Sequence, residues 1–310
     1  FQELKQCKPD KPTEYSATPR NILMKPITTD SGETIGQREY CCEGKDYLVW
    51  AIRTSTDVKL YRTEESTGTT TLIYSGIPKD VKRVRMAQAG ADLYFVDGKS
   101  VLRKYNCNDG ASDVVSPAGQ EPPIASLILF HENRLFLNDV NSPNKVVFST
   151  IDSVGPQYHI YESTAFVQVP DLTPKQSSCN PVVALESWRG EPLIFTAETS
   201  PYIFVAPSGF DIPTGVSLRA TEGNVGAMSQ EGVSSGRNGV FFYNREGLFL
   251  FTGAVSDKVS SIMDPEFARI NPAKSEEVFV QCHDDKVRVY YARGTSTIND
   301  HMMMYYVALR

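Results

Sequence analysis

The sequence lacks a long apolar run, a C-x-x-C pair and an acceptor site for N-linked glycans. Because a membrane-spanning helix needs roughly 20 apolar residues, no segment is expected to cross a bilayer in that form. The first residues carry no apolar signal-peptide core, and the missing glycan acceptor disfavours a eukaryotic secretory history. There is no initial methionine, and the last residues have the pattern of a strand, so we expect a segment of a longer polypeptide.

Cysteine is scarce and widely spread, at positions 7, 41, 42, 107, 179 and 282. None of these spacings matches a zinc site. A chain of 310 residues can bury a core without disulfides. We therefore expect the cysteines to be free and reduced.

Strong positive charge is also missing, since the net charge is −6 and the pI is about 5.4. This balance argues against broad electrostatic binding to duplex nucleic acid. Two short basic runs, 82–85 and 103–105, have the residue types that contact phosphates. We interpret both runs as solvated strand faces.

The most informative stretch is a pair of aromatic runs at 240–243 and 248–251. They flank Asn244-Arg245-Glu246-Gly247, a polar tetrapeptide that ends in the residue most tolerant of positive φ. This pattern predicts a β-hairpin. Because both runs are continuously apolar, each strand is expected to be covered on both faces.

Strand-like runs recur roughly every 8–14 residues along the rest of the chain. They lie at 47–52, 58–61, 71–74, 84–87, 92–97, 100–105, 126–130, 134–137, 145–149, 182–185, 192–196, 202–205, 278–281 and 286–291. One short helix is predicted over 264–270, with Asp264 as N-cap and Pro265 in the first turn. We assign 1–45 to an extended N-terminal arm or part of a preceding domain, and 46–310 to one β domain that continues beyond 310.

A loose repeat organises these strands. An apolar strand, a turn and an aromatic strand recur at 91–105, 126–149, 182–206, 238–260 and 277–292. An interval of about 35–50 residues is typical of a four-stranded propeller blade. We predict an all-β fold, a β-propeller-like meander of short antiparallel strands with few short helices. A pair of β-sandwiches is the alternative, but radial repetition protects strand edges better.

Two motifs resemble functional sites in composition only. Residues 232–236 match G-x-S-x-G, but a nucleophile elbow needs a strand before it and a helix after it, and a strand follows here. We interpret the segment as a flexible turn. Residues 106–110 resemble a calcium loop without its closing glutamate, and are also expected to form a turn.

Acidic and histidine candidates are equally weak. His283-Asp284-Asp285 falls between two predicted strands and fits a hairpin turn better than a metal site. Glu186 and Asp97 would suit a glycosidase pair only if they met at one channel mouth. The sequence therefore predicts no catalytic residue, no metal and no cofactor, and the protein is not expected to be an enzyme.

Several landmarks carry a family resemblance in their order along the chain. They are 83–88 with 93–99, 130–136 with 147–150, 186–195, 223–226 and 239–253, with 262–270 as a short helix after them. Together they resemble the tail-hub and packaged-DNA stabilisation proteins of short-tailed bacteriophages. The resemblance spans about residues 80–308 and does not extend to the N-terminal 40–75 residues.

The resemblance implies a structural virion protein. It implies a β-propeller that forms a ring with copies of itself, expected to be a hexamer, in the head-tail connector of the virion tail, assembled in the host cytoplasm. Portal or adaptor proteins would lie above it and nozzle or needle proteins below, with no membrane contact. The ring would retain packaged DNA until ejection without binding it specifically, which suits an acidic chain.

Assembly surfaces use aromatic and arginine anchors on loops. The residues expected to serve in this way are Arg134, Trp188, Arg189, Phe210 and Arg245. For Trp188 a place in the core is the alternative. Two other functions stay open: a carbohydrate-binding or carbohydrate-active propeller, with aromatics and paired carboxylates at one end, and a host-encoded monomeric scaffold.

Overall fold

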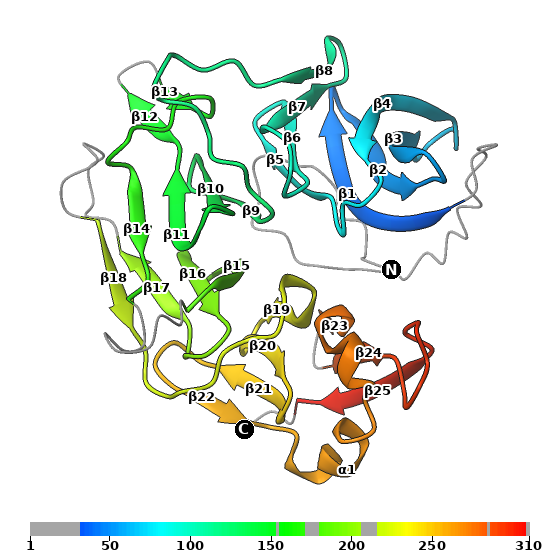
Figure 1. Ribbon diagram of the computed structural model, residues 1–310, viewed down its shortest axis with the longest axis vertical. Helices are drawn as coiled ribbons and strands as arrows, with labels where there is room; N and C mark the ends of the chain where they lie inside the picture. The colour runs from blue at the N-terminus through cyan, green and yellow to red at the C-terminus, as the bar shows by residue number, and fades with distance from the viewer. Residues whose placement is uncertain (1–31, 153–154, 171–179, 206–215, 284–285, 308–310) are drawn as a thin grey trace. The chain divides into compact units, whose positions relative to one another are not determined.

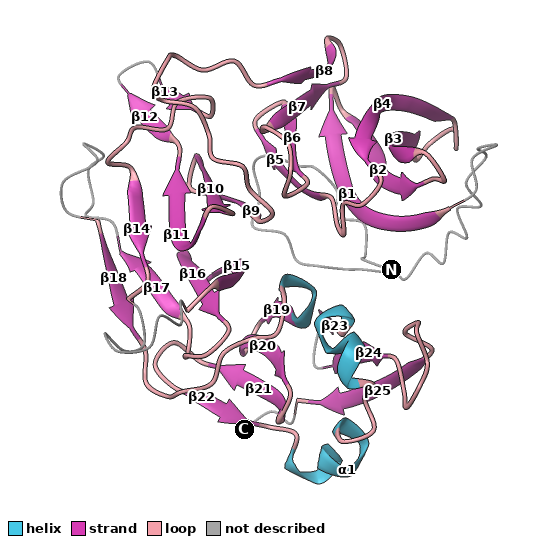
Figure 2. Ribbon diagram, viewed as in Figure 1, coloured by secondary structure: helices cyan, strands magenta, loops and turns pink. Residues whose placement is uncertain are grey.

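The computed structural model describes residues 32–152, 155–170, 180–205, 216–283 and 286–307. These residues form mostly antiparallel strands joined by turns (Figure 1), with only short helical segments (Figure 2). Chain contacts divide them into two compact units, one up to residue 140 with 158–161 and one with the remainder. Within the described part, no helix is long and apolar enough to cross a membrane.

The first unit contains two four-stranded antiparallel sheets and a hairpin. Its strands are β1 (Glu33–Cys42), β2 (Lys45–Arg53), β3 (Asp57–Glu64), β4 (Thr70–Pro78), β5 (Arg85–Ala89), β6 (Asp92–Val96), β7 (Arg103–Asn106), β8 (Gly110–Asp113), β9 (Ile128–His131) and β10 (Arg134–Asp139). Both sheets have their strands in chain order, as a meander requires.

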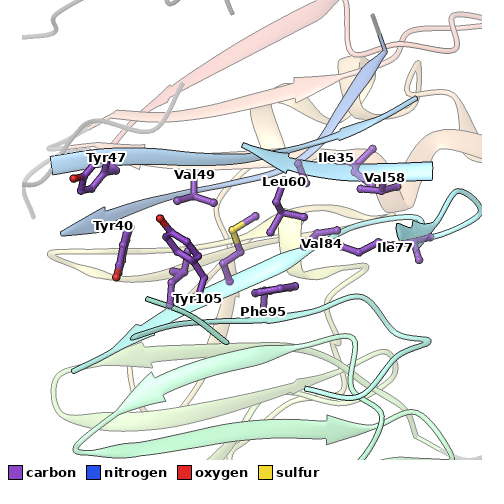
Figure 3. Close-up of a cluster of buried hydrophobic side chains, with 14 of the residues drawn as sticks. Ile35, Tyr40, Tyr47, Val49, Val58, Leu60, Ile77, Val84, Phe95 and Tyr105 are labelled. Carbon is purple, nitrogen blue, oxygen red and sulfur yellow. The ribbon is translucent and has the colours of Figure 1, made fainter. Parts of the chain in front are cut away.

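The core of this unit lies between its two sheets. Alternate residues of β2, including Val49, point to that core together with Leu60 of β3. Figure 3 shows both side chains turned toward Phe95 and Tyr105 of the second sheet. The period of two in β2 therefore decides which face of the first sheet is buried here.

The second unit contains two complete four-stranded sheets and a three-stranded one. Its strands are β11 (Ser142–Phe148), β12 (Thr150–Asp152), β13 (Gly155–Gln157), β14 (Phe166–Gln168), β15 (Val182–Trp188), β16 (Glu191–Thr196), β17 (Tyr202–Val205), β18 (Ser217–Ala220), β19 (Val233–Gly236), β20 (Gly239–Asn244), β21 (Gly247–Phe251), β22 (Ser256–Lys258), β23 (Phe279–His283), β24 (Lys286–Tyr291) and β25 (His301–Tyr306). The complete sheets are β15–β18 and β19–β22, and β23–β25 form the third.

The predicted aromatic hairpin is confirmed as β20 and β21, which pair from Val240↔Phe251 to Asn244↔Gly247. Its two faces belong to different cores. Phe242 packs with Phe195 of the preceding sheet, whereas Phe241 and Tyr243 pack with the last sheet. Continuous apolarity along β20 thus reflects burial on both faces, as expected for a central layer.

The predicted helix exists but is shorter than expected. The α1 helix covers Asp264–Phe267, between the 3₁₀ turns η2 (Ser261–Met263) and η3 (Pro272–Glu277), and η1 (Gln230–Gly232) precedes β19. Asp264 is not the N-cap, because it already has helical dihedral angles and its carboxylate binds Lys258 Nζ at 2.7 Å.

Residues 33–42, which we assigned to an extended arm or part of a preceding domain, form the strand β1. This strand pairs with β2 along its length around the turn at Glu43-Gly44. Ile35, Tyr40 and Cys42 point into the core, while the polar residues between them occupy the exposed side of an edge strand. The high polar content of β1 therefore comes from its outer face. Residues 1–31 lie outside the described part.

The expectation of reduced cysteines is wrong for Cys42 and Cys107, which form a disulfide. It joins the end of β1 to the β7–β8 turn, across 65 residues of sequence and a Cα–Cα distance of 6.3 Å. Within the described residues Cys41 forms no disulfide, and Cys7 and Cys179 lie outside them. No local spacing could reveal this pair, because it arises from packing of the two sheets.

Candidate functional site

The Trp188–Arg189 turn, where β15 meets β16, is the most clearly built of the expected assembly contacts. Trp188 is only 8% exposed and its indole Nε1 donates to the Gly236 carbonyl at 3.0 Å. Its ring also meets Phe251 edge-on, with 6.4 Å between centroids. The indole is thus part of the core, the alternative that the sequence left open.

Arg189 lies over this buried ring and is itself exposed. Its guanidinium carbon is 4.4 Å from the Trp188 ring centre, a cation–π contact. Arg189 and Gly190 both have positive φ, 51° and 79°, as a tight two-residue hairpin turn requires. The turn geometry and the indole together hold one positive charge at the end of the sheet.

Arg245 is the second of the expected contacts that is exposed, and it lies in the turn between β20 and β21. Trp188 contacts Gly236, which lies opposite Gly239 where β19 turns into β20. From Gly239, β20 leads away from Trp188 to Asn244. A strand of this length spans roughly 17 Å. Arg189 and Arg245 therefore lie at opposite ends of the sheets of the second unit.

Of the other two expected contacts, one is buried and the other lies outside the described residues. Arg134 begins β10 in the first unit and is only 3% exposed. Phe210 lies outside the described residues. The sequence could not distinguish Arg134 from Arg189, because both are arginines beside a hairpin turn and only packing buries one of them.

The G-x-S-x-G segment is a strand, not the expected turn. Residues 233–236 form β19, in which Ser234 Oγ accepts a hydrogen bond from the Cys282 backbone N–H at 2.9 Å. Ser235 Oγ lies 3.4 Å from Glu186 Oε1. A strand, β20, follows, so the helix that a nucleophile elbow needs is not at this position.

Asp97 and the basic runs take part in structural contacts. The Asp97 carboxylate accepts hydrogen bonds from the Lys99 and Ser100 backbone N–H groups and pairs with Arg103 at 3.2 Å. Arg103 is 11% exposed at its side chain, so the interpretation of its run as a solvated face is wrong there. Glu186 belongs to the other unit.

The remaining motifs behave as turns. Residues 106–110 connect β7 to β8, and the hairpin of β23 and β24 is confirmed, with His283 opposite Lys286. Residues 284–285 lie outside the described part. Among the residues that the structure describes, no group of three His, Cys, Asp or Glu side chains is arranged to hold a metal ion.

One charged cluster was not predicted. The Tyr291 hydroxyl donates to Glu266 Oε1 at 2.5 Å, and Arg269 and Arg293 pair with the same carboxylate at 3.0 and 3.3 Å. The Tyr291 hydrogen bond and the two guanidinium groups lower the pKa of Glu266. Burial and the hydrogen bond to Glu266 raise the pKa of Tyr291 to about 12. The cluster ties α1 to the end of β24.

We predict that Glu266 contributes stability that acid removes. Because its folded-state pKa is lowered, this contribution is present above the ordinary carboxyl pKa of 4.5 and is lost as the pH falls through the folded-state value. Glu266→Gln should therefore flatten the acid side of the stability profile, measured by urea unfolding between pH 3 and 7. Glu246→Gln, in the exposed β20–β21 turn, is the control. Equal acid sensitivity of Glu266→Gln and the unsubstituted protein would contradict the assignment.

No protein-family model matches the chain, and no curated protein matches it. Among solved structures, it is similar to YCF48 from Cyanidioschyzon merolae, at 11% identity over 90% of this chain and 86% of that one, with a TM-score of 0.50. The N-terminal domain of Nup159 gives 10% identity over 88% and 75%, with a TM-score of 0.48. The predicted fold is confirmed: the chain is an all-β protein of the β-propeller type.

Proposed function

We propose that this chain is a structural, non-enzymatic tail-hub or DNA-stabilisation protein of a short-tailed bacteriophage. It forms a ring with copies of itself, hexameric in the expected case, between portal or adaptor proteins and nozzle or needle proteins. The ring closes the channel around packaged DNA until ejection. The sequence resemblance over residues 80–308 and the propeller fold support this function.

The observation that carries the proposal is the placement of exposed arginines at both ends of the second unit. Arg189 is held on the Trp188 ring at one end, and Arg245 lies in a tight turn at the other. A ring stacked between two neighbours needs anchors on both of its end surfaces, and arginine is frequent among such anchors. A monomeric scaffold has no such need.

The net charge supports the same function. A chain with a net charge of −6 has a weak electrostatic attraction for duplex DNA. Each phosphate neutralised by the channel wall would add salt-sensitive affinity and retard ejection. An acidic ring can therefore surround DNA and still release it.

The test is the composition and yield of intact phage particles. Particles grown with the unsubstituted gene should contain this chain, detected by mass spectrometry of purified virions. The double variant Arg189→Ala, Arg245→Ala should reduce its incorporation at least about ten-fold, the scale of losing anchors of over 1 kcal/mol each. Arg38→Ala, which removes an exposed arginine of β1 in the first unit, should incorporate normally.

Two results would overturn the proposal. The first is absence of the chain from purified particles, and the second is incorporation as an isolated monomer. Binding of the purified chain to a glycan array would then favour the carbohydrate-binding propeller. Monomeric behaviour without association with particles or glycans would favour a host-encoded scaffold.

A further inference from the structure

The last sheet of the second unit has one strand fewer than its neighbours within the described residues. The sheets β15–β18 and β19–β22 each contain four strands, whereas β23–β25 contain three within the described residues. β25, the red strand in Figure 1, pairs with β24 along one side only in that part of the chain. Its Met302 and Tyr306 are 47% and 63% exposed. In the described part of the chain, no strand therefore occupies the position where the neighbouring sheets have their outer strand.

The hydrogen-bonding direction of β25 follows from its neighbours. The Cys282 N–H on β23 donates to Ser234 Oγ and therefore points away from β24. Cys282 lies opposite Val287, so the backbone groups of Val287 point to β25, where its partner is Tyr305. Backbone groups alternate in direction along a strand. The residues of β25 whose N–H and C=O groups point outward are consequently Met302, Met304 and Tyr306.

The chemistry of this edge differs from that of the outer strands β8, β18 and β22. β8 ends in Asp113, β18 carries Arg219 and β22 carries Asp257 and Lys258. Charges of this kind discourage addition of a further strand. β25, His-Met-Met-Met-Tyr-Tyr, contains no Asp, Glu, Lys, Arg or Pro. It therefore lacks the residues that discourage strand addition, and its outward N–H and C=O groups can hydrogen-bond to another strand.

The edge is also complementary to itself. If two β25 strands pair antiparallel about Met304, the outward residues meet one another: Met304 lies opposite its own copy, and Met302 lies opposite Tyr306 twice. Both strands then satisfy their outward N–H and C=O groups. The two Met–Tyr pairs add sulfur–aromatic contacts, and no like charges meet.

We propose that β25 is a self-association site, at which two copies of this chain join their last sheets about a two-fold axis. The occupant of this edge is β25 of the second copy. A two-fold contact cannot lie within a ring that has a single rotation axis. The contact therefore joins free chains before ring assembly, or two rings face to face, and it does not depend on the proposed function.

The test is sedimentation velocity of the full 310-residue chain over a range of concentrations. The unsubstituted chain should show a monomer–dimer equilibrium. Met304→Pro removes an outward N–H without removing a hydrogen bond to β24. Because the dimer contains two copies of Met304, two hydrogen bonds between the strands are lost. Two lost hydrogen bonds should raise the dimer dissociation constant about ten-fold or more. Met304→Lys, which keeps the N–H but adds charge, should weaken the dimer as well.

Ile262→Lys is the matched control, because it adds the same charge at an apolar side chain that is 97% exposed outside this edge. It should leave the dimer intact. Circular dichroism establishes whether each variant is folded. If Met304→Pro is not folded, Met304→Lys decides the outcome. A monomeric unsubstituted chain would overturn the proposal, and so would a dimer that a folded Met304 variant leaves unchanged. Slow amide exchange at Met302, Met304 and Tyr306 in a monomer would assign the edge to a strand of the same chain.

Discussion

Removal of the disulfide between Cys42 and Cys107 is expected to lower the free energy of unfolding by about 4 kcal/mol. The crosslink spans 65 residues, so its loss returns the entropy of a long closed loop to the unfolded chain. It also joins two elements of the first-unit core, β1 and the β7–β8 turn. This stabilisation is a large fraction of the total for a typical domain.

The measurement is urea unfolding of the oxidised protein and of the double variant Cys42→Ala, Cys107→Ala, followed by the fluorescence of Trp50 in the first unit. Cys41→Ala is the matched control, since Cys41 forms no disulfide, and it should change stability by less than about 1 kcal/mol. Equal midpoints for the oxidised protein and the double variant would contradict the crosslink.

Phe242→Ala is expected to lower the free energy of unfolding by about 3–5 kcal/mol, the usual cost of removing a buried aromatic ring. Phe242 is 0% exposed in β20. Its ring lies 5.4 Å from that of Phe195 on β16 and 5.6 Å from that of Phe249 on β21. The substitution would leave a cavity between two sheets of the second unit, where rigid strands limit collapse.

Thermal and urea unfolding of Phe242→Ala, followed by the fluorescence of Trp188 in the same core cluster, would measure this loss. The matched control is Leu72→Ala on β4, whose side chain is 48% exposed. That variant should change stability by no more than about 0.5 kcal/mol. A loss at Phe242 as small as at Leu72 would show that the hairpin is not a central layer.

Much of the fold could be predicted because local patterns decide it. The hairpin at 240–251 combines two apolar runs with a turn that ends in Gly247, and it forms as predicted. The runs that became β2, β3 and β6 are equally regular. In each case the side-chain period and the turn residues lie within a few residues of one another, so no distant contact is needed to recognise them.

The missed elements depend on distant partners. β1 has few apolar residues, and it is a strand because β2 pairs with it and the core receives Ile35 and Tyr40. β8, β18 and β22 are short polar edge strands that form only against an existing neighbour. The disulfide likewise requires packing of two sheets before its cysteines approach.

The candidate site was predicted by residue type but not by burial. Trp188 and Arg134 have the composition of interface anchors, yet both are buried within the chain. Arg189 was named from the sequence, but only the structure shows that it is exposed and that its guanidinium lies over the Trp188 ring. The cluster around Glu266 joins a helix to a strand about 25 residues later, and no spacing motif describes it.

We propose that this chain builds a closed ring in a phage tail. The most direct measurement is negative-stain imaging of the purified chain mixed with the portal complex of the same particle, with class averages viewed along the portal axis. We expect a closed ring of this chain stacked on the portal, lost in the Arg189→Ala, Arg245→Ala variant and retained in Arg38→Ala. Portal particles that gain no density, with the chain remaining free, would contradict it.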